Sequence, residues 1–400
     1  FLFGSLANSP RYSQLSNFDC LMTGLYKFLL ALATLVGTII GAGMFGLPYA
    51  AAQAGLGVTL AYLVVLALAV TTIHLVYGEI VLRSAAKHRL AGYAQMYLGS
   101  WGKLAGSVIF FVTLYLALLA YILVGGEFLS VFLNGWWNIS SAEGGLLVAA
   151  FGFLVVFRGI KTAGALELAM SAVLTVLILG LAGYSFRFIE PNNWSFLNAT
   201  GNIFLPYGII LFALAGGSAI PEISVFLRNG RARLLKRVII IGTVVPAIIY
   251  GIFMLAVSGV SGLKTSPEAL AGLVPFLGSS VIRYGALVGL LAVITSFFTI
   301  GLNIQNSFRL DFGFSKLSSS FLTAAVPLIL FFYGQRDFIG LLSFGGAVLG
   351  GLEGLLLLAI WTKARKHGDR EPEYKLKLQP IMVCLLALMF LAGVIYQFVY

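Results

Sequence analysis

Glycine and proline interrupt an otherwise apolar segment at residues 35–49, which reads Leu-Val-Gly-Thr-Ile-Ile-Gly-Ala-Gly-Met-Phe-Gly-Leu-Pro-Tyr. In a helix interior, glycine costs about 1 kcal/mol and proline about 3 kcal/mol relative to alanine. Main-chain N–H and C=O groups freed at membrane depth are tolerated only where protein or a water-filled cavity satisfies them. We therefore predict that this helix breaks at Gly41-Ala42-Gly43 and lines a cavity. The N–H groups freed at such a break can bind a carboxylate.

The second half of the chain contains a similar interruption, within the apolar segment 202–227. From Phe212 to Glu222 the sequence reads Phe-Ala-Leu-Ala-Gly-Gly-Ser-Ala-Ile-Pro-Glu. Taken alone, such glycines also serve as packing positions where helices cross closely. Two interruptions at corresponding places in two halves of a chain are instead typical of the binding site of a secondary transporter.

Composition indicates the environment in which these segments lie. Of the 400 residues, 60% are apolar and only 10% are charged, which excludes a soluble domain because a water-facing surface needs more charges. The net charge of +11 does not indicate a nucleic-acid surface, since the basic residues lie in short loops between apolar segments. Cys20 and Cys384 lack metal-binding or redox spacing, and no catalytic cluster indicates an enzyme. We predict a protein of the lipid bilayer with no cofactor, no nucleic acid and no evident obligatory protein partner.

Apolar segments long enough to span a membrane define the predicted fold. A helix needs about 20 residues to cross a hydrocarbon core of roughly 30 Å. We predict an all-α polytopic membrane protein with 11 transmembrane helices. The predicted spans are 26–50, 57–80, 104–132, 144–160, 163–187, 202–227, 238–262, 279–307, 318–333, 338–362 and 380–400.

Basic residues orient these spans. With the N-terminus in the cytoplasm, 21 of the 25 Lys and Arg residues fall on the cytoplasmic side, in agreement with the positive-inside rule. The first and sixth spans then run in opposite directions, which predicts a 5+5 inverted repeat with helices 1 and 6 broken. We predict a multi-pass protein of the plasma (cell inner) membrane, with its C-terminus outside. The predicted parts are an N-terminal cytoplasmic tail at 1–25, repeats at 26–187 and 202–362, and an eleventh helix at 380–400.

Several stretches together resemble a known family. Gly37-Thr-Ile-Ile-Gly-Ala-Gly-Met-Phe-Gly-Leu-Pro48 is similar to the first-helix signature of amino acid permeases of the amino acid/auxin and aromatic amino acid permease type, in the amino acid–polyamine–organocation superfamily. Gly78–Arg83, Tyr97–Lys103 and Thr295–Asn303 resemble that family's second helix, first cytoplasmic loop and eighth helix. The resemblance implies a leucine-transporter-like fold, alternating access and an amino acid bound between broken helices 1 and 6. The chain departs from the bacterial aromatic permeases at Ala215-Gly-Gly-Ser218, where they carry Phe-Gly-Phe-His.

An amino acid substrate would be held at both breaks. The N–H groups that follow the first break would meet its carboxylate, which the helix dipole favours, and carbonyls freed at both breaks would meet its ammonium. Aromatic and polar side chains of helices 3, 6 and 8 would surround its side chain, although an aromatic residue such as Tyr115 is also common in helix interfaces. The small residues Ala215-Gly-Gly-Ser218 leave room for a bulky side chain. The predicted substrate-binding residues are Thr38, Gly41, Ala42, Gly43, Met44, Tyr115, Phe212, Ala213, Ala215, Gly216, Thr299 and Asn303.

The coupling ion is expected to be Na⁺ or H⁺. In sodium-coupled proteins that this chain resembles, sodium lies between helix 1 carbonyls and helix 8 oxygens. Spacing assigns the corresponding positions to Gly37, Ile40, Ala292, Thr295 and Ser296, and an all-oxygen set suits a hard cation. Alternatively, the two hydroxyls bond their own helix backbone, and the coupling ion is a proton.

Acidic residues within the spans are the predicted proton-coupling groups, because a buried charge in a membrane is costly and usually functional. They are Glu79, Glu222 and Glu353. For Glu79, an ion pair with Arg83 one helical turn later is the simpler interpretation.

We interpret the chain as a secondary active transporter, a cation-coupled amino acid permease that imports a neutral, hydrophobic or aromatic amino acid. A transporter of polyamines or organic amines is an alternative, which acidic residues facing the cavity would favour. A non-transporting amino acid sensor is another, although sensors usually carry a larger cytoplasmic domain than the short tails here.

Overall fold

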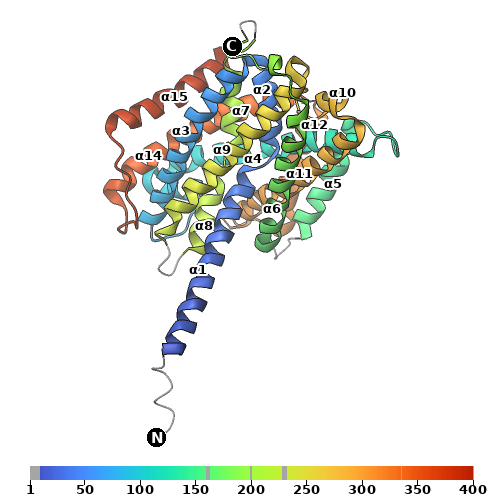
Figure 1. Cartoon of the computed structure of the whole chain (residues 1–400). Coiled ribbons are helices and arrows are strands. Elements are labelled where there is room, and N and C mark those ends of the chain that lie inside the picture. The colour runs from blue at the N-terminus through green and yellow to red at the C-terminus, as the bar shows by residue number, and fades with distance from the viewer. Residues whose placement is uncertain are drawn as a thin grey trace.

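The computed structural model of the chain describes residues 10–158, 163–198, 201–227, 232–310, 312–334 and 336–399. Within these ranges the regular secondary structure is helical, which confirms the predicted all-α class. Eight helices are long and apolar enough to cross a membrane, or up to nine if a bent pair near the start counts as one span. The helices pack as one bundle, in which α1 enters at one end and α15 finishes at the other (Figure 1).

The first half of the chain begins with a broken helix. α1 stops at Ile39, Gly41 is extended with φ −135° and ψ −156°, and the chain resumes through a short 3-10 turn. The two parts are bent by 45°. The elements are α1 (Pro10–Ile39), η1 (Ala42–Gly46), α2 (Leu47–Ala54), α3 (Leu56–Arg83), α4 (Leu90–Leu133), α5 (Ser141–Arg158), α6 (Ala163–Ser185), η2 (Phe186–Phe188) and η3 (Pro191–Asn193).

The second half also begins with a broken helix. α7 stops at Ala213, and helical structure returns at Gly217 after a short irregular stretch. Proline stands in the first turn of α2, α7 and α8, where its missing N–H costs no hydrogen bond. The elements are α7 (Leu205–Ala213), η4 (Gly217–Ala219), α8 (Ile220–Phe226), α9 (Leu234–Ser261), η5 (Gly262–Lys264), η6 (Ala271–Leu273), α10 (Val274–Leu277), α11 (Ser279–Leu310), α12 (Lys316–Phe332), α13 (Phe338–Phe344), η7 (Gly345–Gly350), α14 (Gly351–His367) and α15 (Pro380–Val399).

One helix extends well beyond its predicted limits. α4 begins at Leu90, whereas the predicted span begins at residue 104. The added part bends at Gly99, whose φ of 78° lies in the left-handed region that favours glycine. Leu90, Tyr93 and Ala94 in this part are buried, so packing stabilises a segment that hydropathy alone assigns to a loop.

A wide helical turn interrupts the tenth predicted span, 338–362. Residues Gly345–Gly350 form a π-helix, η7, between α13 and α14. Its glycines allow close contact with α7, because a Cβ on Gly346 would overlap the main chain of Gly208 and Phe212. π-Helical turns are rare and are frequent at functional sites.

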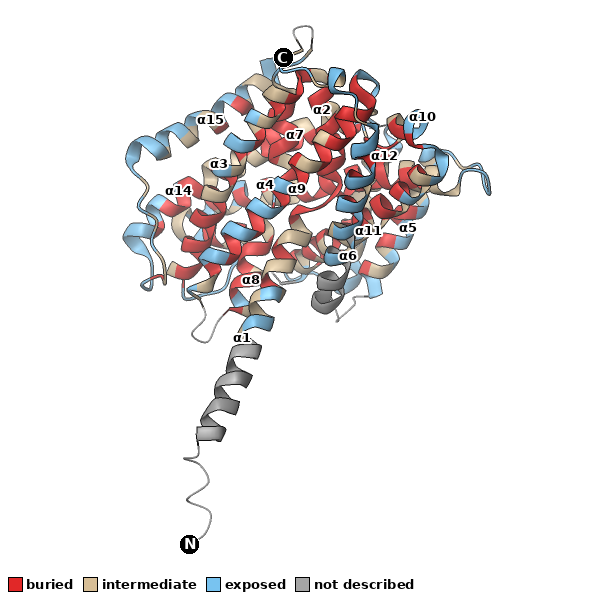
Figure 2. Ribbon diagram, viewed as in Figure 1, coloured by how far each residue is buried: buried red, intermediate tan, exposed pale blue. Residues whose placement is uncertain are grey.

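The surface of the bundle is apolar where its outer helices face away from the core. Val64, Val65 and Leu68 on α3 and Leu385 and Leu388 on α15 are exposed. Figure 2 shows buried residues concentrated in the central helices and exposed residues along α15. A water-soluble protein rarely exposes such extended apolar surface, whereas hydrocarbon favours it, so the chain is a multi-pass membrane protein.

Candidate binding site at the two helix breaks

The two helix breaks touch each other at the centre of the bundle. A Cβ added to Gly43 would lie 2.7 Å from Cα of Ala213, and one added to Gly216 would lie 2.5 Å from Cγ1 of Ile39. Real Cβ atoms essentially never come within 3.0 Å of another heavy atom, so a side chain at Gly43 would displace the Ala213 backbone and one at Gly216 would displace the Ile39 side chain. The sequence predicts both breaks, and the structure brings them together.

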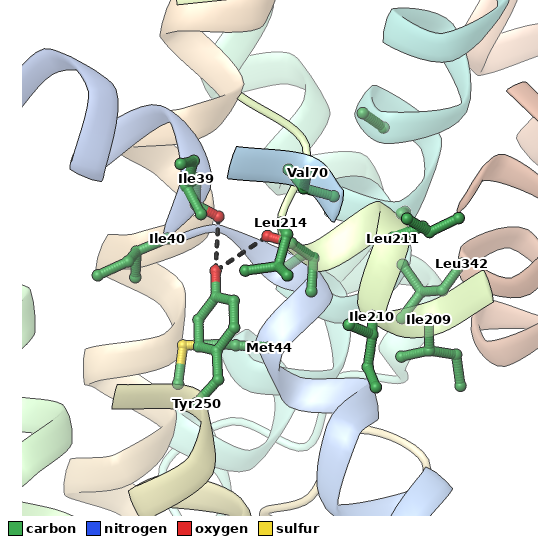
Figure 3. Packing of buried hydrophobic residues seen from close by; sticks show 14 of the residues in the cluster. Ile39, Ile40, Met44, Val70, Ile209, Ile210, Leu211, Leu214, Tyr250 and Leu342 are labelled. Carbon is green, nitrogen blue, oxygen red and sulfur yellow. Dashed lines mark hydrogen bonds between the residues drawn. The ribbon is translucent and has the colours of Figure 1, made fainter. Parts of the chain in front are cut away.

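Tyr250 of α9 connects the two breaks through its side chain. Its hydroxyl reaches the carbonyl oxygen of Ile39 at 2.6 Å and that of Ala213 at 3.1 Å, and the residue is fully buried. Figure 3 shows the phenol between the end of α1 and the end of α7. These carbonyls end their helices and lack the usual partner four residues later. The sequence carries no signal for Tyr250, because the contact joins residues distant in the chain.

A cavity lies against both breaks. Main-chain groups of the breaks form one wall, and one face of α4 forms another. Its lining residues are Thr38, Ile39, Gly41, Gly43, Tyr77, Arg89, Leu90, Phe110, Thr113, Leu114, Ala117, Tyr121, Phe212, Ala213, Ala215, Gly216, Gly217, Ser218, Ile300, Asn303 and Glu353.

Eight of the twelve predicted substrate-binding residues line this cavity. They are Thr38, Gly41, Gly43, Phe212, Ala213, Ala215, Gly216 and Asn303. Ala42 and Met44 point into the buried core instead, and Thr299 directs its hydroxyl to the Thr295 carbonyl at 3.3 Å. Tyr115 also lies outside the lining, because its hydroxyl donates to the Leu322 carbonyl at 2.9 Å.

Several lining residues were not predicted as substrate contacts. Tyr121 takes the place expected for Tyr115, since a Cβ on Gly41 would lie 2.7 Å from the Tyr121 hydroxyl oxygen. Thr113 and Tyr121 stand eight residues apart on α4, a spacing that places both on one helix face. That periodicity was the available sequence signal. Tyr77 and Arg89 carried no such sequence signal, since they reach the cavity from the C-terminal part of α3 and from the loop after it.

The predicted cation positions on α1 and α11 also lie close together. The Ser296 hydroxyl is 3.5 Å from the Ile40 carbonyl oxygen, and the Thr295 hydroxyl donates to the Ala292 carbonyl at 2.8 Å. Ile40, Ala292 and Ser296 are buried. Gly37 lies on α1 one turn before the break. These hydroxyl and carbonyl oxygens fit the donor set of a hard cation, and the same hydroxyls already have backbone partners.

Glu79 is held by several protein groups. Its carboxylate pairs with Arg83 at 2.7 Å and accepts hydrogen bonds from the Trp361 indole at 3.0 Å and the Leu376 N–H at 2.8 Å. It is fully buried and does not line the cavity. These contacts join α3 to α14 and to the segment before α15, which is a structural role.

Arg89 links two helices at one end of the cavity. Its guanidinium pairs with Glu222 of α8 at 3.2 Å and donates to the Asn303 carbonyl at 3.0 Å and the Ser307 hydroxyl at 2.7 Å on α11. Arg89 and Asn303 also line the cavity. We call these four residues the Arg89 network. They join α8 to α11 beside the cavity.

Glu353 of α14 has a different environment from the other two acidic residues. It lines the cavity, and Oε1 would lie 2.8 Å from a Cβ on Gly217 in the second break. No described residue forms a hydrogen bond or ion pair with its carboxyl group. Of the three predicted proton-coupling residues, Glu353 therefore faces the cavity without a protein partner.

A second hollow lies at the opposite end of the molecule. It is lined by residues of α2, α4, α13 and the loop before α10, including Glu127, Glu268, Arg336 and Asp337. Burial raises the pKa of Glu268 in this loop above its usual value. The hollow and the cavity share no lining residue, so packed protein separates them.

Comparison with known proteins adds a family and a fold. A model of the tryptophan/tyrosine permease family matches residues 26–399. The chain is 25% identical to the tyrosine-specific transport system 1 of Haemophilus influenzae, over 83% of this chain and 87% of the relative. It is 23% identical to glutamine transporter 2 of Aliivibrio fischeri, over 84% and 89%. The crystal structure of MhsT in complex with L-phenylalanine has the same fold, with a TM-score of 0.66 at 16% identity, over 93% and 97%.

Proposed function

The chain belongs to the tryptophan/tyrosine permease family, and on that premise we propose that it is a cation-coupled secondary transporter. It imports a neutral, hydrophobic or aromatic amino acid by alternating access, and it makes or breaks no bond. The observation that carries this proposal is the contact of two broken helices at one cavity. The tyrosine-specific and glutamine transporters among the relatives support an amino acid substrate.

The helix breaks suit the two charges of an amino acid. The first N–H groups of a helix have no intrahelical acceptor, and the helix dipole favours a negative group there, so the substrate carboxylate lies at Gly41–Gly43. The ammonium lies near carbonyls at the ends of α1 and α7 and near Thr38. Phe212 and Asn303 then contact the rest of the molecule from the cavity wall.

The spans follow a leucine-transporter-like 5+5 arrangement in this proposal. Besides the eight long helices and the bent pair, we assign two shorter apolar helices as spans. They are α12 and Thr175–Phe188, which consists of the end of α6 and η2, and the total is then eleven. The repeats cover 26–187 and 202–362, with residues 1–25 in the cytoplasm and 380–400 as the last helix. The opposite positions of α1's start and α15's end support an odd number of spans (Figure 1). The Arg89 network then faces the cytoplasm.

The coupling ion has two proposed sites in this chain. Sodium would be held by oxygens of Gly37, Ile40, Ala292, Thr295 and Ser296, which would fix the first break against α11. A proton would be carried by Glu353, which faces the cavity without a protein partner. Glu222 is instead paired with Arg89, and Glu79 with Arg83, so both are assigned structural or gating roles.

Amino acid binding at the breaks can be tested by replacing one glycine with the larger residue alanine. Gly43→Ala places a Cβ 2.7 Å from the Ala213 backbone, and overpacking of this kind costs about 1–3 kcal/mol, so amino acid affinity should fall at least about fivefold. The measurement is equilibrium binding of labelled tyrosine, tryptophan or glutamine to the purified full chain. Gly180→Ala is the matched control, because nothing lies within 4 Å of its added Cβ. Equal affinity for Gly43→Ala and wild type would contradict the proposed site.

An amine carrier remains a second candidate because Glu353 faces the cavity. The Arg89 guanidinium lines the same cavity and opposes the binding of a polycation. Competition decides between the two. Displacement of a labelled amino acid by spermidine at similar concentrations, or direct binding of spermidine alone, would favour the amine carrier.

A further inference from the structure

We propose that Thr113 and Glu353 form a polar subsite that selects amino acids whose side chain ends in a hydrogen-bond donor. Such side chains are the phenol of tyrosine, the indole of tryptophan and the carboxamide of glutamine. The subsite lies in the cavity at the helix breaks, so the proposal rests on the proposed function and names the substrate class for it.

Thr113 differs from three threonines of helices α1 and α3. Thr38, Thr59 and Thr71 each donate to the carbonyl four residues earlier, at 2.7, 2.9 and 2.6 Å. The Thr113 hydroxyl oxygen is buried and makes no hydrogen bond within the described part of the chain, and Thr113 is one of the residues that line the cavity. A buried hydroxyl without a partner costs free energy unless another molecule satisfies it.

Glu353 is the second polar group of the cavity without a protein partner. Its carboxyl group lies against Gly217 of the second break and near the ring of Tyr77, which lies 3.8 Å from the same Cβ position. The π-helix η7 ends three residues earlier. A π-turn adds one residue to an α-helical turn, which rotates the helix after it by about 100°. The rare turn therefore sets which residues of α14 face the cavity, and Glu353 is among them.

Both groups can accept a hydrogen bond from a ligand. A hydroxyl and a carboxyl group each have free lone pairs in either protonation state of the carboxyl group. The surrounding wall includes the apolar side chains of Phe110, Leu114 and Ile300, which are suitable contacts for an aromatic ring. These acceptors suit a side chain that is apolar along its length and carries a donor at its end, which bonds either group. An analogue that lacks the donor can bond neither group in this way and is rejected.

The test measures binding of matched ligands to the purified full chain without any ion gradient. The pairs are tyrosine with phenylalanine, tryptophan with 1-methyltryptophan and glutamine with methionine, and the pair that wild type binds most tightly is used. Wild type should prefer the donor-bearing ligand by about tenfold or more. Thr113→Val and Glu353→Leu should each lower that preference at least about fivefold, with affinity for the analogue within about twofold of wild type.

Two further variants separate selection from other roles. Glu353→Gln keeps hydrogen-bonding capacity but cannot carry a proton, so it should retain most of the preference even if transport fails. Thr323→Val is the control, because the Thr323 hydroxyl donates to Ser319 and lies outside the cavity. If Glu353→Leu does not fold, Thr113→Val alone decides.

Three results would overturn the proposal. Equal wild-type affinity for both members of every pair would remove the polar subsite while leaving the proposed function intact. A Thr113→Val variant that weakens both members of a pair equally would indicate a structural role. If wild type binds no amino acid at all, the proposed function fails and this proposal fails with it.

Discussion

At the residue scale, Tyr250 shows how one side chain stabilises the site. Its hydroxyl joins carbonyls that end two different helices, so it holds the breaks together without occupying the cavity. A hydroxyl carries one proton and donates fully to one carbonyl at a time. The second carbonyl is therefore only partly satisfied, and it remains available for a positively charged ligand group.

Substitution of Tyr250 by phenylalanine tests this role. Loss of the hydroxyl leaves two buried carbonyls unsatisfied, so Tyr250→Phe should destabilise the protein by about 1–3 kcal/mol and weaken amino acid binding. Thermal unfolding and equilibrium binding measure the two effects. Tyr207→Phe is the control, because the Tyr207 hydroxyl donates to the Met389 carbonyl, at α15; it should lower stability without changing affinity. An unchanged affinity in Tyr250→Phe would show that the breaks do not depend on this contact.

Two tyrosines of α4 provide a second comparison at this scale. Tyr121 lines the cavity and Tyr115, which sequence analysis favoured, does not. Tyr121→Phe should therefore change amino acid affinity by about three- to tenfold, the usual range for one hydrogen bond, and Tyr115→Phe by less than about twofold. Parallel titrations of both variants provide the measurement. A larger effect of Tyr115→Phe would restore the sequence-based assignment.

At the element scale, the sequence predicts the broken helices but not how they are joined. Glycines at Gly41–Gly43 and Gly216-Gly217 indicate the two breaks, because glycine weakens helices locally. Most limits of the predicted spans follow from hydropathy. The early start of α4 and the π-helix η7 depend on packing against other helices, as the contacts of Tyr93 and Gly346 show. Tyr250, Thr113 and Arg89 reach the site through contacts between distant segments, which a single sequence does not reveal.

The Arg89 network is an element-scale device, since it ties α8 to α11 at the proposed cytoplasmic end of the cavity. An inward opening must separate these helices, so the ion pair favours the closed state. Its side chains are 22% and 39% exposed, and partly exposed ion pairs contribute about 0.2–1 kcal/mol. The network therefore favours the closed arrangement of α8 and α11 only weakly and does not prevent their separation.

Removal of this ion pair should make the cavity easier to reach from the cytoplasm. In a chain with Cys20 and Cys384 replaced by serine, Ser218→Cys places a thiol in the cavity wall. Glu222→Gln should raise its rate of labelling by an impermeant reagent about two- to fivefold. Glu373→Gln is the control, since it removes the ion pair with Arg370 outside the cavity. Identical labelling rates with and without Glu222→Gln would exclude a gating role.

At the scale of the whole molecule, packed protein separates the cavity at the helix breaks from the second hollow, which is lined by Glu127 and Glu268. The Arg89 network joins α8 to α11 beside the cavity. Under the proposed function, this arrangement is one state of an alternating-access cycle, in which the site at the breaks faces one side of the membrane at a time. We therefore predict that the chain transports an amino acid against its concentration gradient.

Uptake into proteoliposomes tests that claim most directly. The full chain is reconstituted and given labelled tyrosine, tryptophan and glutamine, with an imposed sodium gradient in one set and a proton gradient in the other. We predict concentrative uptake under one gradient, lost in Gly43→Ala and retained in Gly180→Ala. Sodium dependence should be abolished by Ser296→Ala, and proton dependence by Glu353→Gln. No concentrative uptake under either gradient, with folded protein confirmed in the vesicles, would contradict the account.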